Sequence, residues 1–295
     1  MTPVEHPISN RVSAADEAAR LGHAHELAGP ELQRFLDRLF DASGVDLSGY
    51  GKRALQRRLR SCIGAEGLAG LAELSDRMRE DPRLLAKVLD RLMPRVTTMF
   101  RDPPFFQVFR ERVVPLLRTY PHPRLWVAGC STGQEAYSLA ILLREEGLYE
   151  RCRIYATDIN EAVLERARAG VLPLPALEEY EQNYRAAGGI RSLSDYYTRG
   201  EASAVIDAAV LDRIAVFRHD LARDASFNEF HVIFCRNVLM YFDEPLRCRV
   251  HRLLCDSLVR LGFLGLGQSE SLHLSHHESH YQVLAPRRRL YRKVR

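Results

Sequence analysis

Several familiar patterns are missing from the 295-residue sequence. Its six cysteines include no C-x-x-C pair, which argues against a zinc motif and a disulfide framework and favours reduced thiols. The N-terminus has no basic start followed by an apolar run, so we expect no signal peptide. No apolar run is long enough to span a bilayer, so we expect a cytoplasmic protein without direct membrane insertion.

The overall composition is ordinary for a soluble globular protein, with 46% hydrophobic residues and a net charge of +4. A charge this mild does not by itself argue for nucleic acid as a partner, and we expect none. The length is sufficient for one large domain or two smaller ones, each with its own core. We expect a monomer.

Two regions differ in the spacing of their apolar residues. Residues 1–30 are polar and Ala-rich and predict a flexible leader. Residues 31–95 carry apolar side chains at helical spacing, without a strand signal, and predict a small all-helical domain. Residues 96–123 are expected to form a linker and a connecting helix. From residue 124 to 295 short apolar strands alternate with helices, one of which is expected over 245–261.

This alternation predicts an α/β domain with a Rossmann-like fold, in which a mostly parallel, doubly wound sheet carries helices on both faces. Residues 171–212 break the alternation and are rich in tyrosine and turn residues. We therefore expect them to form a small antiparallel β-subdomain inserted in the larger domain.

A loop of small residues follows the first expected strand. In Ala128-Gly129-Cys130-Ser131-Thr132-Gly133, backbone N–H groups can approach a ligand closely at the start of a helix. Asp158 ends the next expected strand, where an acidic residue can accept hydrogen bonds from ribose hydroxyls. The dinucleotide pattern G-x-G-x-x-G is absent, which disfavours NAD. The residues alone leave open a plain tight turn, with Asp158 capping the next helix.

The same loop also fits G-x-S-x-G, the nucleophile elbow of α/β-hydrolases. Ser131 would be the nucleophile, and His219, His251 and His273 are available as bases. The elbow would lie on the first clear strand, however, with no earlier strand to carry an oxyanion-hole loop. A hydrolase is therefore the minor alternative.

Several segments together resemble the CheR family of chemoreceptor methyltransferases. They are KRALQRRLR (52–60), VTTMFRDPPFF (96–106), RLWVAGCSTGQEAYSLAILL (124–143), IYATDINEAVLERARAG (154–170), VIFCRNVLMYFDEP (232–245) and FLGLGQSESL (263–272). The resemblance implies transfer of a methyl group from S-adenosyl-L-methionine to glutamate side chains on the cytoplasmic helices of methyl-accepting chemoreceptors. The product would be S-adenosyl-L-homocysteine.

The resemblance also implies roles for individual residues. Arg101 and Tyr241 are expected to act on the reacting groups. The residues expected to bind the cofactor are Thr97, Arg101, Ala128, Gly129, Glu135, Asp158, Asp220, Leu221, Asn237 and Val238. One departure is that Arg95 stands where the family commonly has a cofactor-contacting asparagine, and MFR stands in place of FFR.

Basic and histidine-rich segments complete the candidate sites. Arg53, Arg57 and Arg60 form one stripe of a helix, which suits an acidic substrate helix, an RNA backbone or a solvated face. A cluster of histidines lies at positions 273, 276, 277 and 280. It lacks accompanying cysteine or carboxylate spacing, so we expect a solvated loop and no metal.

The substrate can differ within this fold, because fold does not fix function. A methyltransferase acting on another protein or on nucleic acid remains an alternative, although CRNVLMY stands where amino-group methyltransferases carry N/D-P-P-Y. Some CheR proteins tether themselves to a receptor peptide through a glycine-containing loop of the inserted subdomain. Here the matching stretch 197–205 is short and has one glycine, which predicts direct recognition of the methylation helices.

Overall fold

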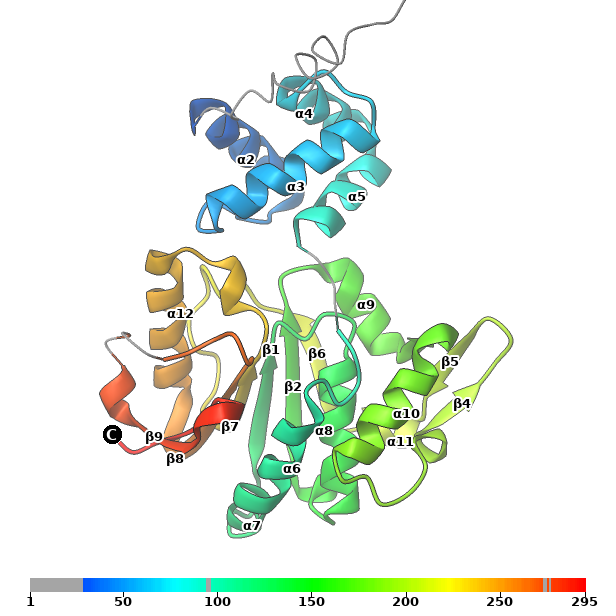
Figure 1. The fold of residues 1–295 in the computed structure, drawn as a ribbon, viewed down its shortest axis with the longest axis vertical. Coiled ribbons are helices and arrows are strands. Elements are labelled where there is room, and N and C mark those ends of the chain that lie inside the picture. Colours follow the sequence, from blue (N-terminus) through cyan, green and yellow to red (C-terminus); the bar gives the residue numbers. More distant parts are fainter. Residues whose placement is uncertain (1–28, 94–96, 273–274, 276) are drawn as a thin grey trace, which may run out of the picture.

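The computed structural model describes residues 29–93, 97–272, 275 and 277–295. Four helices form the N-terminal domain, shown in blue and cyan in Figure 1: α2 (Gly29–Ser43), α3 (Lys52–Ala65), α4 (Leu71–Glu80) and α5 (Pro82–Leu92). Each buries one apolar face in a shared core, as the helical spacing of residues 31–95 predicts. Gly29 and Pro30 begin α2 rather than ending a leader, and the rest of the expected leader lies outside the described residues.

The larger domain is built on a seven-stranded sheet with the order β6-β2-β1-β7-β8-β10-β9. Its strands are β1 (Arg124–Ala128), β2 (Arg153–Asp158), β6 (Ile214–Arg218), β7 (Phe230–Cys235), β8 (Leu258–Leu266), β9 (Tyr281–Ala285) and β10 (Leu290–Lys293). The first five pair in parallel, and β10 runs antiparallel to both of its neighbours. The mostly parallel Rossmann-like sheet predicted from the sequence is confirmed.

Helices cover both faces of this sheet because side chains alternate along each strand. On β1, Leu125 and Val127 join the core formed with α6 (Pro103–Arg112), α7 (Val114–Leu117), α8 (Gln134–Glu145) and α9 (Glu161–Ala169). Trp126 and Ala128 join the opposite core formed with α12 (Glu244–Ser257). Two-sided burial explains why β1 and β7 read as continuous apolar runs.

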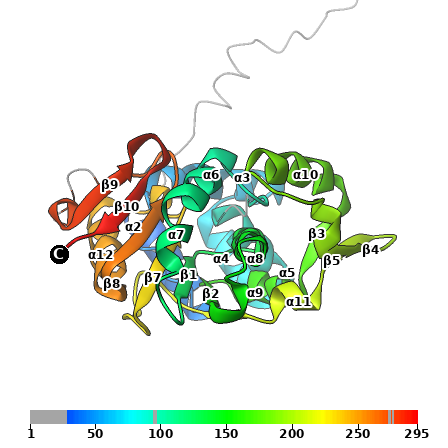
Figure 2. The same cartoon turned by 90° about the horizontal axis from the view of Figure 1, so that it is seen from below.

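The inserted subdomain contains a three-stranded antiparallel sheet in the order β3-β5-β4, which confirms the predicted β-subdomain. Its strands are β3 (Val171–Pro173), β4 (Tyr197–Arg199) and β5 (Ser203–Ile206), with α10 (Leu177–Ala186) between β3 and β4 and α11 (Ala208–Leu211) after β5. In Figure 2 this subdomain and the β8–β10 end lie at opposite ends of the molecule. The turn from β4 to β5 is only three residues long, Gly200 to Ala202.

The helix expected over 245–261 ends four residues earlier than predicted. α12 stops at Ser257, and Leu258 already pairs with Phe230 of β7 as the first residue of β8. Lys293 fixes this transition, since its Nζ donates to the carbonyls of Cys255 and Leu258 at 2.7 and 2.8 Å. Strand pairing therefore overrides the helical spacing of the local sequence.

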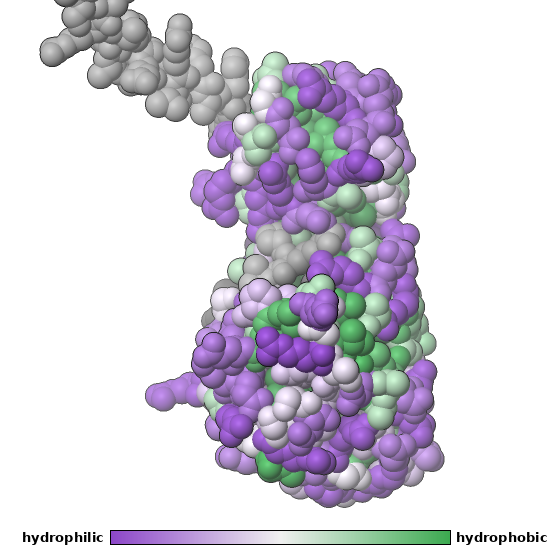
Figure 3. Space-filling model, turned by 90° about the vertical axis from the view of Figure 1, so that its right-hand side faces the viewer, coloured by the Kyte–Doolittle hydropathy of each residue, from purple (hydrophilic) through white to green (hydrophobic). Residues whose placement is uncertain are grey.

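The helical domain lies over the carboxyl ends of the parallel strands (Figure 1). Backbone bonds join the two domains: Gly51 N donates to Tyr241 O at 2.9 Å, and Asp243 N donates to Gly49 O at 2.8 Å. The space-filling view shows two bodies joined at a narrower waist (Figure 3). Among the described residues no helix is long and apolar enough to cross a membrane.

Candidate active site

A pocket opens where the two domains meet, at the carboxyl ends of β1, β2 and β7. In an open parallel sheet, ligands bind at the point where the strand order reverses, and here that point lies between β1 and β7. The pocket brings together most of the residues that the sequence predicts for the site: Thr97, Arg101, Gly129, Glu135, Asp158, Asp220, Leu221, Asn237, Val238 and Tyr241. Ala128 is buried at the end of β1, behind the pocket wall.

The loop from β1 to α8 has a backbone that requires small residues. Gly129 has a φ of 74°, and a Cβ at this position would lie 2.5 Å from Cγ2 of Val238. The N–H groups of Gly129 and Cys130 both donate to the carbonyl of Thr157 at 2.8 Å. The loop is thereby held against the end of β2, and its inner side faces the pocket.

Asp158 is oriented by two backbone donors. Its Oδ2 accepts from Ser131 N and its Oδ1 accepts from Asn160 N, both at 3.0 Å. A carboxylate has about four acceptor positions, so these two bonds fix its direction and leave capacity for a ligand's hydroxyl groups. The N-cap of α9 is Asn160, whose side chain accepts from Ala162 N at 3.0 Å, so the interpretation of Asp158 as the helix cap is wrong.

Asp220 is the second acidic residue in the pocket. It is 7% exposed, and its Oδ1 accepts from Ala222 N at 2.8 Å. Burial raises the pKa of the Asp220 carboxyl above its ordinary value, and the nearby charges of Asp224 and Asp46 raise it further. A buried carboxylate of this kind is a strong acceptor for a donor group on a bound molecule.

Arg236 forms a buried ion-pair network that sequence reasoning did not identify. Its Nη1 bonds to Glu135, and its Nη2 donates to Asp102 Oδ2 at 2.9 Å and to the carbonyl of Arg101 at 3.0 Å. Burial raises the pKa of the Glu135 carboxyl, although Arg236 opposes that shift. Glu135 therefore lines the pocket while its charge is paired, and Arg236 joins β7 to the turn that carries Arg101.

The turn around Arg101 has an unusual backbone conformation. Phe100 and Asp102 have φ values of 50° and 56°, a left-handed region that non-glycine residues rarely adopt. The turn is held because Phe100 is fully buried and its N–H donates to Ser138 Oγ of α8 at 2.8 Å. Strained residues of this kind persist only where surrounding contacts enforce them, and they concentrate at functional sites. The turn carries Arg101, which lines the pocket.

Asn237 lies on a second left-handed turn, with a φ of 61°. Glu270, which is 4% exposed, supports this turn from the connection after β8. Its Oε2 accepts from Asn237 N at 2.9 Å and from Gly267 N at 2.6 Å, and its Oε1 accepts from Met240 N at 3.3 Å. Sequence reasoning missed Glu270, although the residue lies within the quoted segment FLGLGQSESL.

The helical domain contributes directly to the pocket through Tyr50, which sequence reasoning also missed. The guanidinium of Arg58 stacks over the ring of Tyr241, with its carbon 5.0 Å from the ring centroid. Arg58 also donates to Leu92 O at 2.7 Å. The predicted basic stripe of Arg53, Arg57 and Arg60 is exposed on α3, outside the pocket.

Four residues that line the pocket each have a buried polar atom without a hydrogen-bond partner within the described part of the chain. Two of these atoms are nitrogens, His219 Nδ1 and Arg236 Nε, and the two oxygen acceptors are Ser131 Oγ and Asn237 Oδ1. Buried polar groups are nearly always paired, so these atoms fit a bound molecule with donor groups. For a hydrolase, Ser131 Oγ would need a base, and His219 instead directs its Nε2 to Ala225 O at 3.1 Å. This contact of His219 gives the hydrolase alternative no support.

Arg95, His273 and His276 lie outside the described residues. His277 and His280 are half-buried against Cys255 of α12 instead of forming an open solvated loop. No local spacing in the sequence indicates this cysteine partner, because Cys255 and His277 belong to different elements of the fold.

Comparisons with known proteins agree with this architecture. Residues 30–93 match the family model described as CheR methyltransferase, all-alpha domain, and residues 95–289 match CheR methyltransferase, SAM binding domain. The Pseudomonas putida protein called Cher3 is 40% identical over 263 residues, covering 89% of this chain and 96% of that protein. A chemotaxis protein methyltransferase of Vibrio parahaemolyticus is 33% identical over 82% of this chain and 88% of its own length. A chemotaxis protein methyltransferase of Listeria innocua is 30% identical over 78% of this chain and 85% of its own length.

Both domains and the pocket between them are thus accounted for by one family. The glycine loop, the acidic end of β2 and the orphaned buried atoms are the features that a nucleoside-bearing ligand requires at this edge of the sheet. The chain belongs to the CheR methyltransferase family, and it is an S-adenosylmethionine-dependent methyltransferase.

Proposed function

We propose that this protein transfers methyl groups to glutamate side chains on the cytoplasmic helices of chemoreceptors and so takes part in chemosensory adaptation. The observation that carries the proposal is the shared pocket of Arg101, Tyr241 and the acidic and amide residues at the strand ends. A cation and a tyrosine beside the cofactor residues suit an acidic acceptor. The relatives from Vibrio parahaemolyticus and Listeria innocua, named chemotaxis protein methyltransferases, support the same conclusion.

The cofactor residues divide by chemistry. Asp158 would accept hydrogen bonds from the ribose hydroxyls, and Asp220 with Leu221 would flank the adenine. Asn237, Val238, Thr97 and the glycine loop would hold the methionine end. Ser131 Oγ and Asn237 Oδ1, which are buried without a partner in the described chain, would accept from its ammonium group.

S-adenosylmethionine supplies an electrophilic methyl group on a positively charged sulfur. A glutamate side chain is already ionised at neutral pH, so the chain needs no general base to activate it. Opposite charges disappear during the transfer, and a dry, aligned site therefore favours the reaction. Tyr241 would direct one carboxylate oxygen, and Arg101 would orient the carboxylate without binding it too tightly, since ground-state stabilisation slows the reaction.

The acceptor helix would approach across α3. Arg53, Arg57 and Arg60 are exposed on that helix. Arg58 of the same helix stacks on the ring of Tyr241 in the pocket. A basic surface attracts an acidic, glutamate-bearing helix and steers its approach. The three-residue turn between β4 and β5 leaves little backbone for pairing with an added peptide strand, so recognition would not use a receptor tether.

The deciding experiment uses S-adenosylmethionine carrying a labelled methyl group together with receptor-containing membranes. We expect label on the receptor that alkali releases as methanol, because carboxyl methyl esters are base-labile. Receptors with the acceptor glutamates changed to glutamine serve as the control and should take up no label. Alkali-stable label, or label on nucleic acid, would instead favour a methyltransferase acting on another substrate. Binding of the tethering pentapeptide at micromolar concentration would contradict the expected direct recognition.

A further inference from the structure

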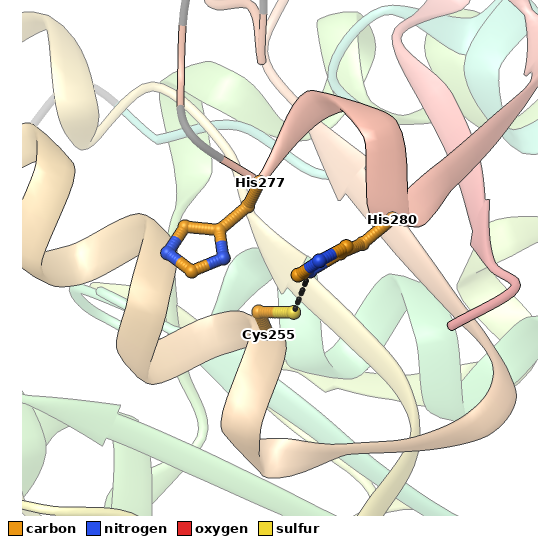
Figure 4. A group of neighbouring side chains, drawn as sticks. All are labelled: Cys255, His277 and His280. Atoms are coloured by element: carbon orange, nitrogen blue, oxygen red, sulfur yellow. Dashed lines mark hydrogen bonds between the residues drawn. The ribbon is translucent and has the colours of Figure 1, made fainter.

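A cysteine and two histidines, none of which lines the pocket, converge near the end of α12 (Figure 4). Cys255 lies in the last turn of α12, His277 immediately precedes the short helix η5 (Glu278–His280), and His280 ends it. Their ligand atoms all lie within 4.8 Å of one another. Cys255 Sγ is 3.7 Å from Nδ1 of His280. The segments that carry them are far apart in sequence, so the fold itself creates the cluster.

These separations match what one tetrahedral ion requires. Zinc binds thiolate sulfur at about 2.3 Å and imidazole nitrogen at about 2.0–2.1 Å, which places sulfur and nitrogen ligands roughly 3.5 Å apart. The observed distance of 3.7 Å between Sγ and Nδ1 already has that size. The other ligand atoms are no more than 4.8 Å apart. Rotation of the imidazole rings would bring them to the separations that zinc requires.

Both sides of the cluster are held by contacts that do not involve the cluster side chains. Lys293 Nζ donates to the carbonyls of Cys255 and Leu258 and fixes the end of α12. On the other side, Val294 N donates to His280 O at 2.8 Å, and His280 N donates to His277 O at 2.9 Å. Ligands on supported elements lose little freedom when they bind an ion, which favours affinity.

The donor set selects the class of metal. One thiolate and two imidazoles suit zinc and related transition metals, whereas magnesium and calcium prefer oxygen ligands. Cys255 is 3% exposed, and both histidines are half-buried, so the cluster is partly shielded from bulk water. Three protein ligands on a tetrahedral ion leave a fourth position, which water can fill.

We propose that Cys255, His277 and His280 form a zinc-binding site that joins the end of α12 to the segment before β9. This replaces the expectation of a solvated histidine loop without a metal. The ion would connect two elements of the β8–β10 end of the sheet by direct coordination. Such a site stabilises the folded state, because the unfolded chain does not hold the three ligands together.

Cobalt(II) titration of the metal-free, full-length protein tests the proposal, with no polyhistidine tag and a non-chelating reductant. We expect one equivalent to bind and to produce a thiolate-to-cobalt charge-transfer absorption in the near ultraviolet, which zinc then abolishes. Cys255→Ser should remove this absorption. His277→Ala and His280→Ala should each weaken zinc binding by at least about tenfold. Zinc should raise the melting temperature of the wild type and of neither histidine variant.

Matched controls come from the same molecule. Cys248→Ser changes a half-buried cysteine on the same helix, and His122→Ala changes an exposed histidine. Both should bind cobalt like the wild type. Circular dichroism and S-adenosylhomocysteine binding report whether each variant is folded, and the histidine variants keep the test valid if Cys255→Ser is unstable. Absence of the charge-transfer band, or an unchanged band in Cys255→Ser, would overturn the proposal. Because no readout uses methylation, the result is independent of the proposed function.

Discussion

The guanidinium of Arg58 lies 5.0 Å from the ring centroid of Tyr241, so a helix of the N-terminal domain contacts the tyrosine expected at the reaction centre. Cation–π contacts orient both partners, and Tyr241 is also held through its carbonyl by Gly51 N. The helical domain therefore shapes the pocket as well as offering a surface to the substrate.

Removing the Arg58 side chain should slow methyl transfer while cofactor affinity stays unchanged. The Arg58→Ala variant loses the stacking on Tyr241, worth about 1 kcal/mol, which corresponds to roughly a fivefold fall in kcat/KM. Arg83→Ala is the control, since Arg83 is an exposed arginine of the same domain, on α5, outside the basic stripe. Methylation kinetics and calorimetry with S-adenosylhomocysteine make the comparison. Equal kinetics for the two variants would show that the stacking has no functional role.

Asp158→Ala should weaken binding of S-adenosylhomocysteine by about 2–3 kcal/mol, because it removes a charged acceptor for the ribose hydroxyls. Asp158→Asn keeps one acceptor oxygen and should fall between Ala and the wild type. Circular dichroism is needed alongside calorimetry, since Asp158 also accepts from the N–H groups of Ser131 and Asn160. An unchanged affinity in a folded Asp158→Ala protein would remove this residue from the cofactor site.

Tyr241→Phe isolates the hydroxyl, because the ring can still stack beneath Arg58. We expect normal folding, normal cofactor affinity and turnover reduced by roughly tenfold, the effect of losing one hydrogen bond in the reacting complex. Single-turnover measurements at saturating cofactor and receptor provide the test. Wild-type turnover would mean that Tyr241 acts by packing alone.

Reversing two charges of the basic stripe, with Arg53→Glu and Arg57→Glu, should weaken receptor methylation and leave cofactor affinity intact. Both side chains are exposed, so the defect should shrink as salt screens their charge. Arg252→Glu with Arg260→Glu gives the same change in net charge at exposed positions of the catalytic domain. Similar defects in both double variants would indicate a general charge effect instead of a docking surface.

Asp220→Asn should raise thermal stability at neutral pH while weakening cofactor binding. Burial, together with Asp224 and Asp46, raises the pKa of the Asp220 carboxyl above its ordinary value of 3.8. The folded state then holds this proton more tightly than the unfolded state, so Asp220 costs stability as pH rises through that window. The stabilisation by Asn should disappear below the ordinary pKa. Asp256→Asn, which changes an exposed carboxylate, is the control for the substitution itself.

Much of the fold follows from the spacing of apolar residues. β1 and β7 are short apolar runs because both of their faces are buried, and this pattern is visible in the sequence. The helix end expected from the sequence is too late, because residues 258–261 continue a helical spacing whereas Leu258 already pairs with Phe230 of β7.

The pocket residues taken from the family motifs converge, whereas their supports could not be predicted. Arg236 and Glu270 act through partners on other elements, and a single sequence contains no record of such pairs. The cysteine beside His277 and His280 is a further case, because ligands brought together by tertiary structure have no local spacing. The roles of these residues therefore become visible only in the folded structure.

Glu270 supports the turn of Asn237 from a segment that follows β8, beyond every residue that lines the pocket. A fragment ending before β8 would keep all the pocket-lining side chains and lose the carboxylate that satisfies three backbone N–H groups. Cofactor affinity thus depends on a residue beyond the pocket lining. During synthesis, the turn of Asn237 would gain its support only after Glu270 has left the ribosome.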